Sequence, residues 1–214
     1  MTFVIFPGLD GTSLLLREFA ALADALVIEY PRDEVLSYDA LATRAIAQMP
    51  EHPVIIGESF GGAIAVLVAS RVSARALILV NSFIVPPLPR ALAWLPIATL
   101  LRVQPPESLL AWWLAGGSRE RARLHREAVS SVSREVLASR IRMALSVDVR
   151  KELQSTTMPL LDLRSRGDRL VGARSREAVM NARPDATTAD IDGPHALLFS
   201  EPQPAREAIR DFIC

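Results

Sequence analysis

The residues around Ser59 form a pattern that could make its hydroxyl a nucleophile. The segment 57–61 reads Gly-Glu-Ser-Phe-Gly and lies between the apolar run Val54–Ile56 and the small-residue stretch Phe60–Val72. A Gly-x-Ser-x-Gly turn between a strand and a helix lifts the serine hydroxyl above the sheet edge, in a strained backbone conformation. The helix N-terminus also favours developing negative charge. The pattern therefore predicts a nucleophilic serine, with an ordinary glycine turn as its alternative.

A serine hydroxyl needs a general base before it can attack, and the chain contains three histidines. His52 precedes a predicted strand and is expected at the surface. His125 lies among charged residues of a predicted helix and is expected to be solvated. His195 follows the last predicted strand, and sites in open α/β sheets form at the carboxyl ends of parallel strands. His195 is therefore the predicted base.

Together these residues resemble the α/β-hydrolase family, in which the nucleophile elbow is followed along the chain by an acid and then by the histidine. The resemblance covers nearly the whole chain outside residues 84–157. It implies a catalytic triad of Ser59, Asp168 and His195. Asp168 follows the predicted strand Pro159–Leu163, and it would accept a hydrogen bond from the imidazole and fix its tautomer.

Other aspartates are weaker candidates for the acid. Asp162 lies inside the predicted strand and points to one face of the sheet, whereas Asp190 and Asp192 are close to His195 in the chain. For Asp168 itself, the alternative is a turn aspartate that follows a glycine. Chain order, loop placement and the family resemblance favour Asp168.

The resemblance also implies an oxyanion hole. In the family, one backbone N–H comes from the loop after an early strand and the other from the residue after the nucleophile. Here these donors would be the N–H groups of Leu9 and Phe60, and fixed donors of this kind stabilise a developing oxyanion. Many relatives carry His-Gly where this chain has Pro7-Gly8. Asp10 and Thr12 are interpreted as turn or helix-cap residues. Glu58 could tune the electrostatics beneath the site, and it is given no catalytic role.

Alternating strand and helix patterns must position these side chains. Predicted strands are Phe3–Phe6, Ala25–Tyr30, Val54–Ile56, Ala76–Val80, Pro159–Leu163 and Thr187–Ile191. Predicted helices are Ser13–Leu26, Tyr38–Met49, Phe60–Val72, Ala173–Ala182 and Glu201–Ile213. Such alternation predicts an α/β three-layer sandwich with a mostly or wholly parallel six-stranded sheet. This would be a minimal α/β-hydrolase fold that lacks the family's first two strands, with Ala25–Tyr30 at one edge.

Residues 84–157 interrupt this alternation with proline-rich and helix-spaced sequence. They are predicted to form a helical insertion, dividing a core of residues 1–83 and 158–214. In the family such an insertion is a lid over the pocket. Three tryptophans, Trp94, Trp112 and Trp113, could line an apolar acyl pocket. The alternatives are that they pack the lid onto the body or that an amphipathic lid meets a membrane.

Composition limits the partners. Lys plus Arg and Asp plus Glu both number 24, which gives no reason to expect nucleic acid. No basic segment precedes the first apolar run, and no apolar stretch is long enough to span a bilayer. The one cysteine, Cys214, cannot form an internal disulfide. A cytoplasmic protein without metal, organic cofactor or stable membrane insertion is expected.

These inferences predict a serine hydrolase that cleaves a small-molecule carboxylic ester or thioester through an acyl-serine intermediate. The same triad could serve carbon–carbon bond hydrolysis or acyl transfer, because one fold hosts many reactions. A third reading is a small-molecule binder that keeps the fold without turnover. The acyl group, the leaving group and the choice between monomer and homodimer stay open at this point.

Overall fold

Six parallel strands form one sheet in the computed structural model, which describes residues 1–103 and 106–213; Cys214 lies outside them. The strand order is β2-β1-β3-β4-β5-β6. The strands are β1 (Phe3–Phe6), β2 (Ala25–Val27), β3 (Val54–Glu58), β4 (Ala76–Val80), β5 (Leu160–Ser165) and β6 (Thr187–Ile191). All neighbouring pairs are parallel, so the predicted sheet is confirmed.

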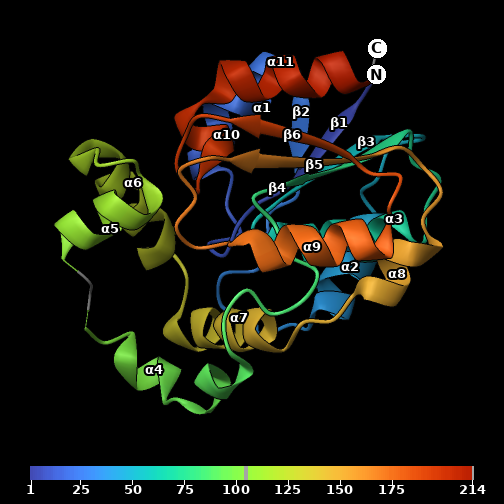
Figure 1. Ribbon diagram of the computed structural model, residues 1–214. Helices are drawn as coiled ribbons and strands as arrows, with labels where there is room; N and C mark the ends of the chain where they lie inside the picture. Colours follow the sequence, from blue (N-terminus) through green and yellow to red (C-terminus); the bar gives the residue numbers. More distant parts are fainter. Residues whose placement is uncertain (104–105, 214) are drawn as a thin grey trace.

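Helices cover both faces of this sheet (Figure 1). One face carries α1 (Arg17–Ala23) and α11 (Pro202–Ile213); the other carries α2 (Tyr38–Ile46), α3 (Gly61–Ala69), α8 (Arg150–Ser155) and α9 (Ala173–Ala182). Every residue of β3 and β4 is buried, as expected for strands with helices on both sides. This covered sheet is the rigid support for the loops at its carboxyl edge.

Two predicted boundaries at the start of the chain are wrong. The predicted helix Ser13–Leu26 begins as a short 3₁₀ turn, η1 (Leu14–Leu16), and α1 ends at Ala23. It ends there because Asp24 adopts a left-handed conformation, with φ of 48°, which returns the chain into β2. The strand β2 stops at Val27 rather than Tyr30, because the Tyr30 N–H donates to the carbonyl of Gly11.

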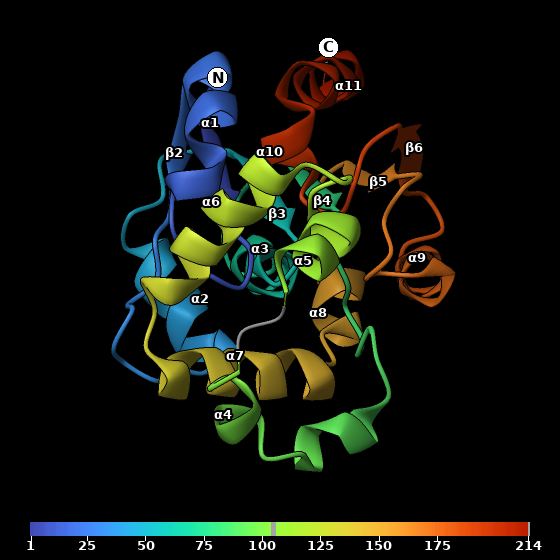
Figure 2. The same ribbon diagram turned by 90° about the vertical axis from the view of Figure 1, so that its left-hand side faces the viewer.

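The segment between β4 and β5 contains helices and, within its described residues, no strand. These are η2 (Arg90–Trp94), α4 (Ile97–Leu100), α5 (Glu107–Leu114), α6 (Arg119–Ser130), α7 (Arg134–Ser146) and α8. In Figures 1 and 2, α5 and α6 lie at the edge of the sheet toward which the strands point. Leu153 of α8 instead joins the apolar cluster beside α3. The other helices between β4 and β5 contribute to small apolar clusters, one of which also includes Leu9 of the loop after β1.

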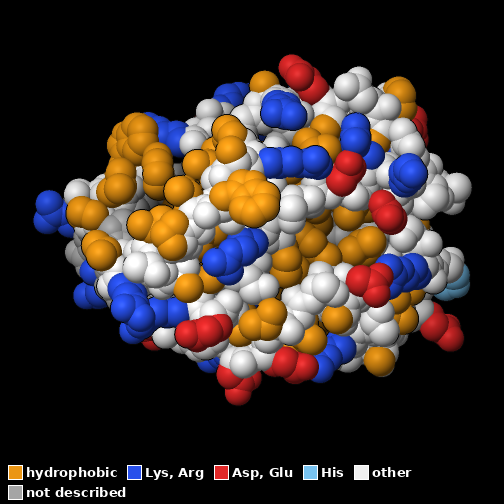
Figure 3. All heavy atoms as spheres, turned by 90° about the horizontal axis from the view of Figure 1, so that it is seen from below, with side chains coloured by type: hydrophobic (Ala, Val, Ile, Leu, Met, Phe, Trp, Pro, Cys, Tyr) orange, Lys and Arg blue, Asp and Glu red, His pale blue; other side chains and the backbone are white. Residues whose placement is uncertain are grey.

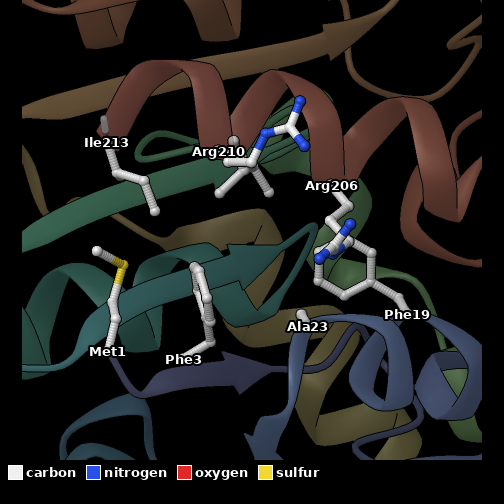
Figure 4. Close-up of a pocket in the computed structure, with 8 residues that line it drawn as sticks. Met1, Phe3, Phe19, Ala23, Arg206, Arg210 and Ile213 are labelled. Carbon is white, nitrogen blue, oxygen red and sulfur yellow. The ribbon is translucent and has the colours of Figure 1, made fainter.

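A cavity of about 230 Å³ lies between α1, α11 and the start of β1 (Figure 4). Met1, Phe3 and Ile213 are among the residues that line it. The cavity lies at the amino end of β1, whereas Ser59 follows the carboxyl end of β3. The cavity and Ser59 are therefore at opposite edges of the sheet. Among the described residues, no helix is both long and apolar enough to cross a membrane.

Candidate active site

Ser59 occupies a sharp turn between β3 and α3. Its φ is +51°, a left-handed conformation that costs free energy for any residue other than glycine. Hydrogen bonds hold it there: the Ser59 N–H donates to the carbonyl of Val80 at 3.0 Å, and its own carbonyl accepts from the Ser82 hydroxyl at 2.7 Å. The backbone conformation is thus the strained one that the Gly-x-Ser-x-Gly pattern predicts.

Close backbone approach explains the glycines of this turn. A Cβ atom added to Gly57 would stand 2.6 Å from the Cα of Gly62. One added to Gly61 would overlap the carbonyl oxygens of Phe6 and Pro7. Side chains at these two positions would therefore push α3 away from β1 and β3, and with it the serine.

Ser59, His195 and Asp168 are joined by hydrogen bonds. The Ser59 Oγ lies 2.9 Å from Nε2 of His195, and Nδ1 of the same ring lies 2.9 Å from Oδ2 of Asp168. The other carboxylate oxygen of Asp168 accepts from the N–H groups of Leu170 and Val171, at 2.7 and 3.0 Å. The structure therefore brings together the three residues that the sequence singled out, across 136 positions of chain.

These contacts favour the ionised form of the Asp168 carboxyl group. Burial by itself raises the pKa of this carboxyl. The hydrogen bond and charge of His195 and the two backbone N–H groups outweigh burial, so the pKa of Asp168 lies below its ordinary value. An ionised carboxylate beside Nδ1 can orient the ring and stabilise an imidazolium.

Asn81, which follows β4, positions the loop of His195. Its side-chain amide donates to the carbonyl of His195 at 2.7 Å and to the Ser165 hydroxyl at 2.8 Å. Its side-chain oxygen accepts from the Ser165 N–H at 2.7 Å. The residue is fully buried with φ of +44°, a conformation that asparagine tolerates better than most residues. Asn81 was not among the predicted site residues, although an asparagine at a strand end was a usable signal.

Glu58, for which no catalytic role was predicted, is a second positioning residue. Its carboxyl is buried directly before the nucleophile, and Oε1 accepts from the Leu198 N–H at 3.0 Å. This bond ties the end of β3 to α10 (Leu197–Ser200), the short helix that follows His195. Burial raises the pKa of Glu58 to about 7.

The loop after β1 has its carbonyl groups occupied. The Tyr30 hydroxyl donates to Pro7 at 3.1 Å, the Gly11 N–H donates to Gly8 at 3.1 Å, and Arg140 donates to Leu9 and Asp10 at 2.9 and 2.8 Å. In contrast, the N–H groups of Leu9 and Phe60 donate to no acceptor within the described part of the chain. The loop is next to the serine, because a Cβ at Gly8 would stand 3.9 Å from that of Ser59.

Arg140 reaches this loop from α7 of the insertion. Its guanidinium is buried, it also donates to the carbonyl of Pro31 at 2.8 Å, and it lies 5.3 Å from the centre of the Tyr30 ring. Arg140 was not among the predicted site residues, since one arginine in a charged helix carries no distinguishing signal. The interpretation of Asp10 as a turn residue is confirmed, because its carboxylate accepts from both the N–H and the hydroxyl of Thr12.

The remaining titratable candidates lie elsewhere. His52 is exposed, as predicted, and contacts the Ser73 hydroxyl at 3.2 Å. Asp162 is fully buried and pairs with Arg164 at 2.9 Å, away from His195. Within residues 1–103 and 106–213, no group of three or more His, Cys, Asp or Glu side chains could hold a metal ion.

The prediction that His125 is solvated is wrong. Its side chain is only 8% exposed and lies edge-on against the ring of Phe199, 5.6 Å between centres. The reason is helical spacing, since Ala122, His125 and Ala128 share one buried stripe of α6, whereas Arg119 and Arg123 are exposed. Burial lowers the pKa of His125 to about 4, and its Nε2 finds no hydrogen-bond partner among the described residues.

The structure does not bring the three tryptophans into a pocket. Trp94 is 91% exposed, Trp112 52% and Trp113 41%, and of the three rings only that of Trp112 has a recorded stacking partner in the described residues, the guanidinium of Arg169. The helix α5 buries its alanines, Ala111 and Ala115, and therefore turns its tryptophans outward. A cavity of about 450 Å³ between α4, α5, α6 and α7 is lined instead by other residues: Leu101, Val103, Leu110, Leu114, His125, Arg126, Val129, Ser130, Val132, Ser133, Arg134 and Leu137.

Known structures with this fold include several hydrolases. A hydrolase from Pseudomonas aeruginosa PA01 aligns with a TM-score of 0.80 at 18% identity, over 99% of this chain and 89% of that one. A thermophilic esterase from Thermogutta terrifontis gives 0.80 at 20% identity, over 100% and 89%. An enol-lactonase from Burkholderia xenovorans LB400 gives 0.79 at 17% identity, over 99% and 90%.

The sequence itself matches one family model. Among curated proteins, none matches this chain significantly. The family model described as "Serine aminopeptidase, S33" matches residues 29–203, which include the strand-and-turn around Ser59 and extend through His195. This match spans well over half of the chain and agrees with the sheet order and the serine turn described above. The chain is therefore an enzyme of the α/β-hydrolase superfamily and belongs to the serine aminopeptidase S33 family.

Proposed function

We propose that this enzyme cleaves a carboxylic ester or thioester through an acyl-serine intermediate. The observation that carries the proposal is the hydrogen-bonded series from the Ser59 hydroxyl through His195 to Asp168, with both distances at 2.9 Å. A serine, a base and an orienting acid in hydrogen-bond contact are the parts that nucleophilic acyl transfer requires.

The proposed reaction proceeds in two halves. Nε2 of His195 takes the proton of Ser59 as its Oγ attacks the acyl carbon, while the carboxylate of Asp168 stabilises the imidazolium. The N–H groups of Leu9 and Phe60 hold the oxyanion, a contribution of about 10²–10³ in rate per donor. His195 then protonates the leaving group. Water, deprotonated by the same ring, releases the acid and restores the serine.

We propose further that residues 84–157 form a lid whose cavity of about 450 Å³ receives an apolar acyl group. Most of its lining side chains are aliphatic, and Leu9 packs against the cluster that contains Val132 and Leu137, two residues of the cavity wall. Leu9 thus connects the cavity to the proposed oxyanion hole. The esterase and enol-lactonase among the structural neighbours support acyl–oxygen cleavage as the reaction to test first.

The test combines a covalent probe with a substrate screen. A fluorophosphonate should label the native protein, and Ser59→Ala should abolish both the labelling and turnover of p-nitrophenyl esters and acyl thioesters. The matched control is Ser73→Ala, because Ser73 and His52 form another serine–histidine contact, exposed and 3.2 Å long. It should keep full labelling.

Other outcomes separate the alternative functions. Absence of labelling in the folded protein indicates a binder and refutes the proposal. If Ser59 is labelled but neither esters nor thioesters are turned over, the result favours carbon–carbon bond hydrolysis or acyl transfer by the same residues. A series of esters with increasing acyl-chain length then tests whether the cavity holds the acyl group. The value of kcat/KM should fall for chains that are too long to fit in it.

A further inference from the structure

The outer side of the insertion carries an unusual number of large apolar side chains. Of the twelve large hydrophobic residues that are exposed in the described part of the chain, nine lie between positions 88 and 113. They are Leu88, Leu92, Trp94, Leu95, Leu100, Val103, Leu109, Trp112 and Trp113, here called the insertion face. Figure 3 shows hydrophobic side chains gathered at the left of the molecule, on the side of the insertion, with Lys and Arg side chains beside them.

Helix α5 exposes its two largest side chains. Its small residues Ala111 and Ala115 are buried, at 3% and 0% exposed, whereas Trp112 and Trp113 face outward. Single exposed apolar residues are ordinary, but an accumulation of large ones marks a contact surface. All three tryptophans of the chain belong to the insertion face.

The insertion is also positively charged. Residues 84–157 contain eleven Lys and Arg against six Asp and Glu, a formal charge of +5, and the rest of this neutral chain therefore carries −5. Four exposed arginines lie on or next to the elements of the insertion face: Arg90, Arg102, Arg119 and Arg123. The apolar residues and the excess of positive charge thus lie on the same segment.

We propose that the insertion face binds the surface of a lipid bilayer that contains anionic lipids. Tryptophan is enriched at the level of lipid headgroups, and arginines beside apolar side chains are attracted to acidic headgroups. A second copy of the chain is a poorer partner, because a twofold dimer through this face would place one positive insertion against another. The binding needs no turnover, so it stands or falls separately from the proposed reaction.

One contact links this face to the candidate site. Arg169, the neighbour of Asp168, lies 4.3 Å from the centre of the Trp112 ring and donates to the Trp112 carbonyl at 2.6 Å. The face that meets the bilayer is therefore attached to the loop of Asp168. An ester drawn from the membrane would approach the enzyme next to its reacting residues.

Vesicle binding tests the proposal with the full-length protein. Vesicles of phosphatidylcholine alone are compared with an equal mixture of phosphatidylcholine and phosphatidylglycerol, at low and high salt. We expect co-sedimentation with the mixture, weakened by salt, and little with phosphatidylcholine alone. Tryptophan emission should shift to shorter wavelength on binding, because no tryptophan lies outside the insertion face.

Two variants locate the surface. The double substitution Trp94→Ser and Trp113→Ser keeps Trp112 with its Arg169 contact and should lower the affinity at least tenfold. Arg90→Glu with Arg102→Glu should remove the preference for phosphatidylglycerol. The matched control is Val35→Ser, because Val35 is exposed to 56% but lies outside the insertion. It should bind like the native protein, and circular dichroism verifies the fold of each variant.

Three results would overturn the proposal. The first is no binding to the anionic vesicles at low salt. The second is binding that neither pair of substitutions changes. The third is a stable dimer that the tryptophan substitutions dissociate, in a protein without affinity for vesicles, which would assign the face to a second copy of the chain.

Discussion

The substitution Asp168→Asn tests the hydrogen-bonded series at its most restrictive point. One carboxylate oxygen of Asp168 accepts from the N–H groups of Leu170 and Val171, at 2.7 and 3.0 Å. In the variant, the amide oxygen must take this place, since an NH₂ group would face two donors. The amide NH₂ then faces Nδ1 of His195, where Oδ2 stood at 2.9 Å. The ring is forced into the tautomer that carries its proton on Nε2.

That tautomer cannot act as the base, because Nε2 would present a proton to the Ser59 hydroxyl, 2.9 Å away. We expect kcat for the preferred ester to fall by about 10⁴, the loss typical of this change in a Ser–His–Asp arrangement. This corresponds to about 5 kcal/mol of transition-state stabilisation. The free energy of unfolding should fall by no more than about 1 kcal/mol, since both backbone bonds are kept.

Steady-state kinetics and urea unfolding of the same preparations measure the two quantities. The matched control is Asp192→Asn, because Asp192 lies in the loop before His195 but pairs only with the exposed Arg166. It should keep kcat within about twofold, as expected for an exposed ion pair. An Asp168→Asn enzyme that retains more than a tenth of its kcat refutes the tautomer reasoning.

Three further predictions concern Glu58, Arg140 and the backbone of Ser59. Burial raises the pKa of Glu58 from an ordinary 4.5 to about 7, so its protonated form contributes stability that is complete below about pH 4.5 and lost as pH rises through about 7. Glu58→Gln should remove this decline, about 3 kcal/mol in size, when urea unfolding is measured at about pH 5 and about pH 8. Arg140→Met should lower kcat by up to about 10²–10³, the value of one oxyanion donor, because the carbonyls of Leu9 and Asp10 lose their partner. Arg142→Met, an exposed neighbour on the same helix, should leave kcat unchanged, and equal losses in both variants would contradict the assignment. Because Ser59 has φ of +51°, Ser59→Gly should be more stable than Ser59→Ala by about 1 kcal/mol in thermal unfolding, and equal stabilities would mean that the turn is unstrained.

Local patterns in the sequence, together with the resemblance to the α/β-hydrolase family, were sufficient to predict the fold and to select Ser59, Asp168 and His195. Apolar runs such as Val54–Ile56 identify strands buried on both faces, and the glycines around Ser59 record a backbone approach that no side chain permits. In a parallel sheet the carboxyl ends of all strands lie at one edge. Loops after β3, β5 and β6 therefore had to meet there, and Ser59, Asp168 and His195 with them.

The supporting residues were decided by tertiary structure. Arg140 acts on Leu9 across 131 positions, and Asn81 on the His195 loop across 114, so the local sequence identifies the partner of neither residue. Burial depends equally on distant partners. The arginines next to His125 in the sequence led to the prediction that it is solvated, but Phe199 covers it. The tryptophans show the opposite case, since residue type favoured the interior and the packing of Ala111 and Ala115 turned them to the surface. Periodicity and glycine spacing are local properties, whereas hydrogen-bond partners and burial exist only once the chain has folded.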